Sequence, residues 1–337
     1  MQSTRRYSIY AIIRWQRWIL IGLVLLMSIP VILYDQLHWE WLRIPWQPVS
    51  VIGIAIAFYL GFKNNSSYDR LWEARKIWGG IVNASRSFTV MARDFVDTSA
   101  ASGRYSQQEI SRIQQRLVYR QVAWLYALAL QLRKPSKWEH FSKGDQKFRV
   151  SANTDFAESK FERIQPYLTT TDFEYIMRKG NKASHLLSLQ SKDIMQLREQ
   201  QILDGFLHQQ MQKMITEFYT LMGKSERIKN FPFPRQYAGI NYYFTILFVL
   251  LLPFAMLGIF AENYNIWLTI PFSIVAAWVF ITMEMIGDYS ENPFEGLYND
   301  VPILGISKSI EIDIRQMLEE VDLPAAEAPI GQMKILV

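Results

Sequence analysis

The sequence predicts an all-α, multi-span membrane protein with four transmembrane helices and a large helical cytoplasmic region. Apolar residues make up 50% of the 337-residue chain, and they are concentrated in blocks near its two ends. The middle is polar, with apolar residues at spacings of three and four and no alternating strand pattern. These blocks divide the chain into residues 1–62, two membrane helices; 63–236, the helical region; 237–286, two further membrane helices; and 287–337, a C-terminal segment.

The first block, residues 15–34, has the roughly 20-residue length that a bilayer requires. Trp15, Trp18 and Tyr34 suit the interfacial aromatic belts. Basic residues precede the block, as in a signal peptide, but its apolar core is too long and no small-residue cleavage site follows before Tyr34. We therefore expect it to remain in the protein as a membrane helix.

The second block, residues 49–62, is too short to cross a full hydrocarbon core. It is either a buried helix or a helix whose far end lies in a water-filled vestibule. The chain turns polar at Lys63 without a proline, which predicts one continuous helix that leaves the membrane. Ile54, Phe58 and Phe62 are four residues apart, a spacing that places them on one helix face.

The polar middle is expected to be helical, with a surface excursion at 133–157 and a helix end at Gly223. Residues 242–260 and 266–286 form the third and fourth predicted spans, in which Pro253 and Pro271 are tolerated. Glu284 is the main acidic residue at membrane depth, and we expect it to pair with a basic residue near the membrane surface.

Lysine and arginine distribution predicts the orientation. The two short connections between spans carry Arg43 alone, whereas the termini and the middle carry the other basic residues near the spans. By the positive-inside rule both termini and the middle are cytoplasmic. We expect a multi-pass protein of the inner membrane.

Several function classes are disfavoured by the composition. The chain has no cysteines, its 4 histidines are scattered, and no dense basic run predicts nucleic-acid binding. Catalytic and phosphate-binding motifs are absent, so we expect no enzyme, cofactor or metal site. A pore lined by apolar side chains is the leading hypothesis. A secondary transporter and a membrane-anchored scaffold remain the alternatives, although the sequence shows no internal repeat.

Three stretches resemble the bestrophins, most closely their bacterial branch: the Ile54, Phe58 and Phe62 row, the segment from Asp69 to Arg75 (DRLWEAR), and Glu291-Asn292-Pro293-Phe294. The resemblance runs from the first span to about Met317. It implies a homopentameric ion channel with one central pore on the five-fold axis, whose neck is lined by the second helix of each subunit.

The resemblance also implies site residues. The pore neck falls on Ile54, Phe58 and Phe62, and a cytoplasmic aperture falls on Phe206, with Leu207 as the neighbouring register. Asn64 and Asn65 follow the neck and are expected to line a vestibule.

Ion preference is predicted from the neck. The positive edges of two phenylalanine layers would favour monovalent anions such as chloride, while a cation-selective channel is the alternative within the family. Animal members bind calcium just after the NPF segment. Here only Glu295 and Asp300 are acidic in that run, and Leu297 stands where a carboxylate is expected, so we expect no calcium activation.

Overall fold

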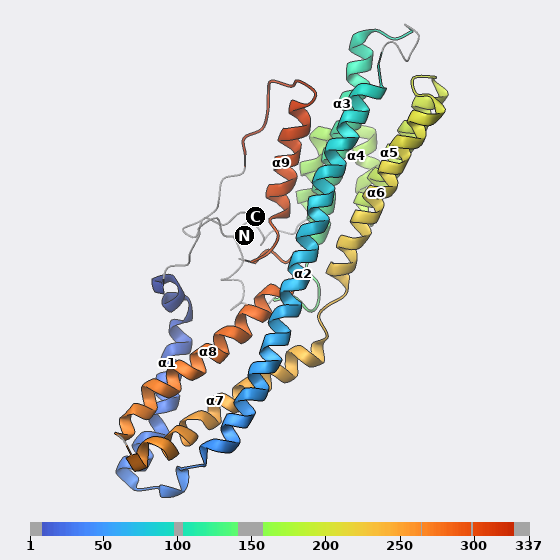
Figure 1. Ribbon diagram of the computed structural model, residues 1–337. Coiled ribbons are helices and arrows are strands. Elements are labelled where there is room, and N and C mark those ends of the chain that lie inside the picture. The colour runs from blue at the N-terminus through green and yellow to red at the C-terminus, as the bar shows by residue number, and fades with distance from the viewer. Residues whose placement is uncertain (1–8, 98–103, 141–157, 264, 298, 327–337) are drawn as a thin grey trace. The chain divides into compact units, whose positions relative to one another are not determined.

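The computed structural model describes the chain except for residues 1–8, 98–103, 141–157, 264, 298 and 327–337. Within the described part every regular element is a helix (Figure 1), as the sequence predicts. Among the described residues four helices are long and apolar enough to cross a membrane, and each contains one of the four apolar blocks. Most of the predicted excursion at 133–157 lies outside the described residues.

The chain folds as two compact units. The span unit comprises Thr4–Arg70 and Pro232–Glu291, and the α3 unit comprises chiefly Leu71–Phe231 and Asn292–Val337. The boundary between them falls inside one continuous helix, α2 (Trp46–Phe95). This helix runs through Lys63 without interruption, which confirms the predicted continuation. The predicted divisions after residues 62, 236 and 286 concern where the chain leaves the bilayer, and they stay a prediction.

In the span unit, α1 (Ile9–Leu37), α7 (Arg235–Asn263) and α8 (Thr269–Ser290) pack together with the first part of α2. Short 3-10 turns lie at Glu40–Leu42 and Ile266–Leu268. Pro271 lies in the first turn of α8, where its missing N–H would have no helical partner in any case. An apolar cluster forms much of the packed interior and contains Leu23, Met27, Val49, Ile56, Leu60, Phe248, Val249, Leu252, Ala255 and Ala277.

In the α3 unit, α3 (Gln107–Arg133) is the central helix. It contacts α5 (Lys182–Glu199), α6 (Gly205–Asn230), α9 (Ile303–Gln316) and the 3-10 segment Glu158–Tyr167, while α4 (Thr170–Met177) packs on α5. A capping box between Ser106 and Glu109 begins α3. From Leu117 onward α3 is almost wholly buried, so its charged residues need partners from neighbouring helices.

Helix α6 does not end at Gly223, so that prediction is wrong. The helix continues to Asn230 because Met222, Ser225 and Ile228 extend its buried face past the glycine. A glycine inside a helix costs only about 1 kcal/mol relative to alanine, which this packing offsets. The helix ends at Asn230. Its C-cap, Phe231, directly precedes Pro232 and is extended, because a proline disfavours helical backbone in the residue before it.

Candidate functional site

The candidate site is a row of exposed apolar side chains on α2 in the span unit, which we call the neck ridge: Ile54, Phe58 and Phe62. Their side chains are exposed by 71%, 66% and 59%, although each is large and apolar. The same helix face continues with exposed Asn65 and Asp69. One face of a single helix thus changes from apolar to polar directly after Phe62.

The opposite face of α2 is packed. Ile56, Leu60, Lys63 and Ser67 are buried there, at successive spacings of four, three and four residues. At Gly53 the α7 side chain of Phe248 lies so close that an added Cβ would be 2.8 Å from its ring. The absence of a side chain at Gly53 lets α7 pack closely against α2 on this side.

A cavity of about 490 Å³ adjoins the two phenylalanines of the neck ridge. The Phe58 and Phe62 rings stand edge to face, with centroids 4.6 Å apart. Helix α2 and the segment that begins α7 supply the lining residues Phe58, Tyr59, Phe62, Lys63, Ser66, Phe233, Pro234, Tyr237 and Asn241. The rings are therefore bordered by open space within the span unit.

A buried ion pair follows the neck ridge directly. The Nζ atom of Lys63 lies 2.5 Å from Oε1 of Glu284 on α8 and 3.8 Å from Oδ1 of Asp288. The other Glu284 oxygen accepts a hydrogen bond of 2.9 Å from the Asn241 amide on α7. The predicted pairing of Glu284 with a basic residue is confirmed, and the pair joins α2, α7 and α8.

The two predicted vestibule residues differ in their surroundings. Asn65 is exposed, whereas Asn64 is half-buried and its amide oxygen is buried against Gly287 of α8. A side chain at Gly287 would collide with that amide. Asn64 therefore contacts α8, and of the two asparagines Asn65 is the one with the exposed side chain.

The predicted aperture residue lies at the start of α6 in the α3 unit. Asp204 caps this helix by accepting a hydrogen bond of 2.8 Å from the backbone N–H of Leu207. Phe206 is 82% exposed, whereas Leu207 packs against the apolar core of the unit. Of the two residues that the sequence offers for the aperture, Phe206 and Leu207, only Phe206 has a largely exposed side chain.

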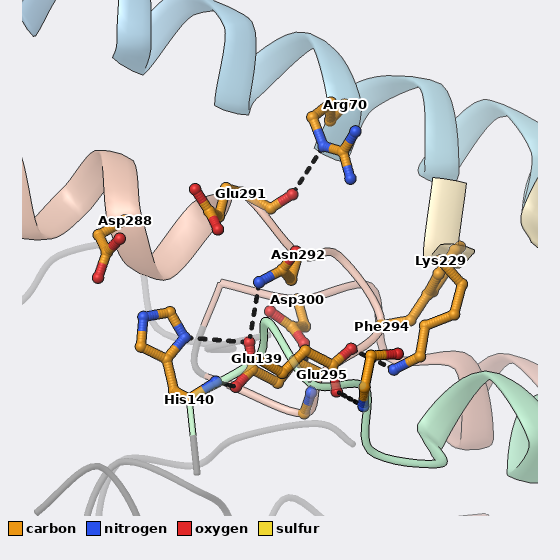
Figure 2. Close-up of polar contacts among 12 residues, drawn as sticks. Arg70, Glu139, His140, Lys229, Asp288, Glu291, Asn292, Phe294, Glu295 and Asp300 are labelled. Atoms are coloured by element: carbon orange, nitrogen blue, oxygen red, sulfur yellow. Dashed lines mark hydrogen bonds and ion pairs between the residues drawn. The ribbon is translucent and has the colours of Figure 1, made fainter. Parts of the chain in front are cut away.

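The loop after the last span, Asn292 to Val301, lies in the α3 unit. Asn292-Pro293-Phe294 forms the predicted turn, in which the Glu295 N–H donates to the Asn292 carbonyl at 3.3 Å. Figure 2 shows the carboxylate of Glu295 accepting from the backbone N–H of His140 and lying 3.1 Å from Nδ1 of its ring. The side chain of Asn292 donates to the same carboxylate at 3.3 Å.

Two basic side chains, Lys229 and Arg133, pair with acidic side chains at this loop. Lys229 of α6 is paired with the carboxylate of Glu139 (Figure 2). Arg133 of α3 is fully buried; it lies 3.6 Å from the carboxylate of Asp300 and donates to the carbonyls of Phe294 and Val301. Both acidic side chains are therefore neutralised by the chain itself.

Burial shifts the pKa values of these groups. It raises the pKa of Asp300 to about 7, although the neighbouring Arg133 opposes the shift. It also raises the pKa of Glu139 and lowers the pKa of Lys229. Sequence reasoning found Glu295 and Asp300 but missed Arg133, Glu139 and Lys229, because no local spacing links residues so distant along the chain. In the residues that the structure describes, no group of three or more metal-ligating side chains is found.

Comparison with known proteins gives the family. A sequence model described as "Bacterial/Fungal Bestrophin protein" matches residues 8–316. The chain belongs to the bacterial and fungal bestrophin family. The resemblance to the bestrophins is thereby confirmed.

Relatives of this bestrophin cover most of its length. A protein of Escherichia coli named "Voltage-dependent anion channel-forming protein YneE" is 28% identical over 283 residues, which are 84% of this chain and 80% of the relative. A protein of the same description from Ralstonia nicotianae is 28% identical over 85% of this chain and 83% of its own. A crystal structure of a bacterial bestrophin homologue from Klebsiella pneumoniae superposes with a TM-score of 0.72 at 26% identity, covering 90% of this chain and 98% of the other.

Proposed function

We propose that this bestrophin assembles as a homopentamer around one central pore and conducts monovalent ions, anions such as chloride above all. Ile54, Phe58 and Phe62 of each subunit would form the neck. Phe206 would form the cytoplasmic aperture, and Asn64 and Asn65 would line the vestibule below the neck. The named channel-forming activity of the Escherichia coli and Ralstonia relatives supports the channel assignment.

The observation that carries the proposal is the neck ridge itself. Exposed apolar side chains also occur on α1, where a lipid-facing surface explains them. On α2, however, the exposed face turns polar at Asn65 and Asp69, within the same helix and the same unit. A pore helix whose apolar part is the constriction and whose polar part meets water accounts for this change.

Rings of these side chains would act as a dry barrier. Five copies of one apolar side chain around an axis exclude water, so an ion crosses only after partial dehydration or after the ring widens. The edge of a phenylalanine ring carries partial positive charge. If the Phe58 and Phe62 edges face the axis, they favour anions, in agreement with the names of the relatives.

The proposed setting is the inner membrane, with both termini and the α3 unit on the cytoplasmic side. The near absence of basic residues from the two short connections between spans supports this orientation.

The test is bilayer recording of the purified protein under a salt gradient. An anion channel gives a reversal potential near that of chloride, whereas a reversal potential near that of the cation supports the cation-selective alternative. Phe58→Ala should raise conductance severalfold because it removes one barrier layer. Saturable flux without channel currents would favour a transporter, and a complete lack of ion flux would favour a scaffold.

A further inference from the structure

The cytoplasmic end of the neck ridge is accompanied by three charged side chains of the span unit. Lys63, the residue after Phe62, has a side chain only 3% exposed. Its Nζ lies 2.5 Å from Glu284 and 3.8 Å from Asp288, so that two carboxylates face one ammonium group. Asp288 is 39% exposed and Glu284 is buried.

Stability alone does not explain why a membrane helix carries such a pair. Removing two charges from water costs several kcal/mol per ion, and apolar replacement of a buried pair is often neutral or stabilising. The pair adjoins the last neck position, however, and charges in a low-dielectric surrounding act over longer distances than charges in water. With Asp288 the group carries one more negative than positive charge, and this charge would be felt by an ion that leaves the neck.

We propose that Lys63, Glu284 and Asp288 form a charge-balancing group that sets ion preference at the inner end of the neck; this inference rests on the proposed function. In this view Lys63 attracts anions, and the two carboxylates limit that attraction. Asn241 holds Glu284 toward Lys63 through its 2.9 Å hydrogen bond and acts as a positioning residue.

The test measures the anion-to-cation permeability ratio from reversal potentials under a salt gradient. Lys63→Met, which keeps length but removes the positive charge, should lower the ratio on the order of threefold. Glu284→Gln should raise it by a similar factor. The combined Lys63→Met/Glu284→Gln variant keeps the net charge of the native group and should return the ratio close to the native value.

Asp288→Asn is the variant least able to disturb folding, because Asp288 is partly exposed and the Lys63–Glu284 contact remains. It should raise the permeability ratio in the same direction as Glu284→Gln. Gln16→Leu is the matched uncharged control. Gln16 is buried, its amide donates to Thr282 at 3.1 Å and accepts from Trp278, and its loss should lower thermal stability without moving the reversal potential.

A purely structural pair gives a different result. If Lys63→Met and Glu284→Gln both lower stability and leave the reversal potential unchanged, or shift it in the same direction, the inference is overturned. If Phe58→Ala alters permeation while Asp288→Asn leaves the ratio unchanged, the inference fails and the proposed function stands. If the native protein itself passes no ions, the proposed function fails first.

Discussion

The span unit and the α3 unit are stabilised in different ways. In the span unit apolar packing predominates, and the ion pairs within it include Lys63 with Glu284 and Arg235 with Glu291. In the α3 unit buried charges join the helices, as where Arg120 of α3 contacts Asp193 and Asp172 at 2.6 and 2.9 Å. The span unit also exposes the apolar side chains of the neck ridge. We expect substitutions at the buried charges of the α3 unit to act chiefly on stability, and substitutions on the neck ridge to act chiefly on permeation.

The largest loss of stability is expected from Arg120→Met in the α3 unit. Removing one member of a buried charge network costs about 3–5 kcal/mol, because Asp193 is left buried with a partner missing. Thermal unfolding in detergent measures the loss. Arg86→Met, which removes a half-exposed arginine paired with Asp313, is the control and should cost under about 1 kcal/mol. Equal losses in the two variants would contradict the stabilising role of the buried charges in the α3 unit.

A smaller loss is expected from Tyr167→Phe. The fully buried carboxylate of Glu311 accepts hydrogen bonds of 2.5 Å from Tyr126 and 2.6 Å from Tyr167. Because these donors stabilise the charged form, the pKa of Glu311 stays below its usual value despite burial, which acts in the opposite direction. Loss of one donor should cost about 1–3 kcal/mol in the free energy of unfolding. Tyr175→Phe, at a ring that is 40% exposed, is the control and should change little.

Asp300 is expected to make the stability of the protein depend on pH, with an effect of intermediate size. Its folded pKa of about 7 exceeds the ordinary value of 3.8, so between pH 4 and 7 the folded state binds more protons than the unfolded state. Stability should therefore fall as pH rises through this window. The raised pKa of Glu139 acts in the same direction. The free energy of unfolding, measured from pH 4 to 8, should decrease as pH rises, and this decrease should be smaller in Asp300→Asn. A stability that rises across the window would contradict this assignment.

Phe58→Ala should have a much smaller effect on stability than on permeation. Its side chain is 66% exposed, and substitutions at exposed positions usually change stability by about 0.5 kcal/mol or less. The same variant should raise conductance severalfold. A melting temperature lowered as strongly as by Arg120→Met would show that the ring is a packing residue rather than a neck residue.

The smallest effect is expected when calcium is added or removed during current recording. Glu139 and Asp300 already pair with Lys229 and Arg133, and Leu297 offers no carboxylate, whereas calcium prefers six to eight oxygen ligands. Among the described residues no group of three or more metal-ligating side chains is found. Currents recorded in calcium and in chelator should be equal. A current that requires calcium would contradict this prediction.

Local periodicity was enough to predict the features that lie on single helices. The four-residue spacing of Ile54, Phe58 and Phe62 predicted that they share one helix face, and the change at Lys63 predicted a continuous helix. Glu284 was expected to pair, although only the structure identifies Lys63 as its partner. The helix end at Gly223 was predicted wrongly, because tertiary packing of Ile228 outweighs the low helix propensity of glycine.

The long-range charge pairs could not be predicted. Arg133 and Asp300 meet across the α3 unit, and so do Glu139 and Lys229. No spacing rule connects such positions, and each residue resembles an ordinary surface charge until the fold buries it. The choice between Phe206 and Leu207 for the aperture also required the structure, which shows Phe206 exposed and Leu207 packed.

The most direct test of the neck ridge uses the absence of cysteine from the native chain. A single cysteine is introduced by Phe58→Cys, and a membrane-impermeant, charged thiol reagent is added during bilayer recording. Leu25→Cys, at a 63% exposed position on α1, provides a lipid-facing control. If Phe58 lines the pore, the reagent changes the current of Phe58→Cys irreversibly and leaves Leu25→Cys unaffected. An unchanged current in Phe58→Cys, with the cysteine shown by mass to be modified, would contradict the central claim.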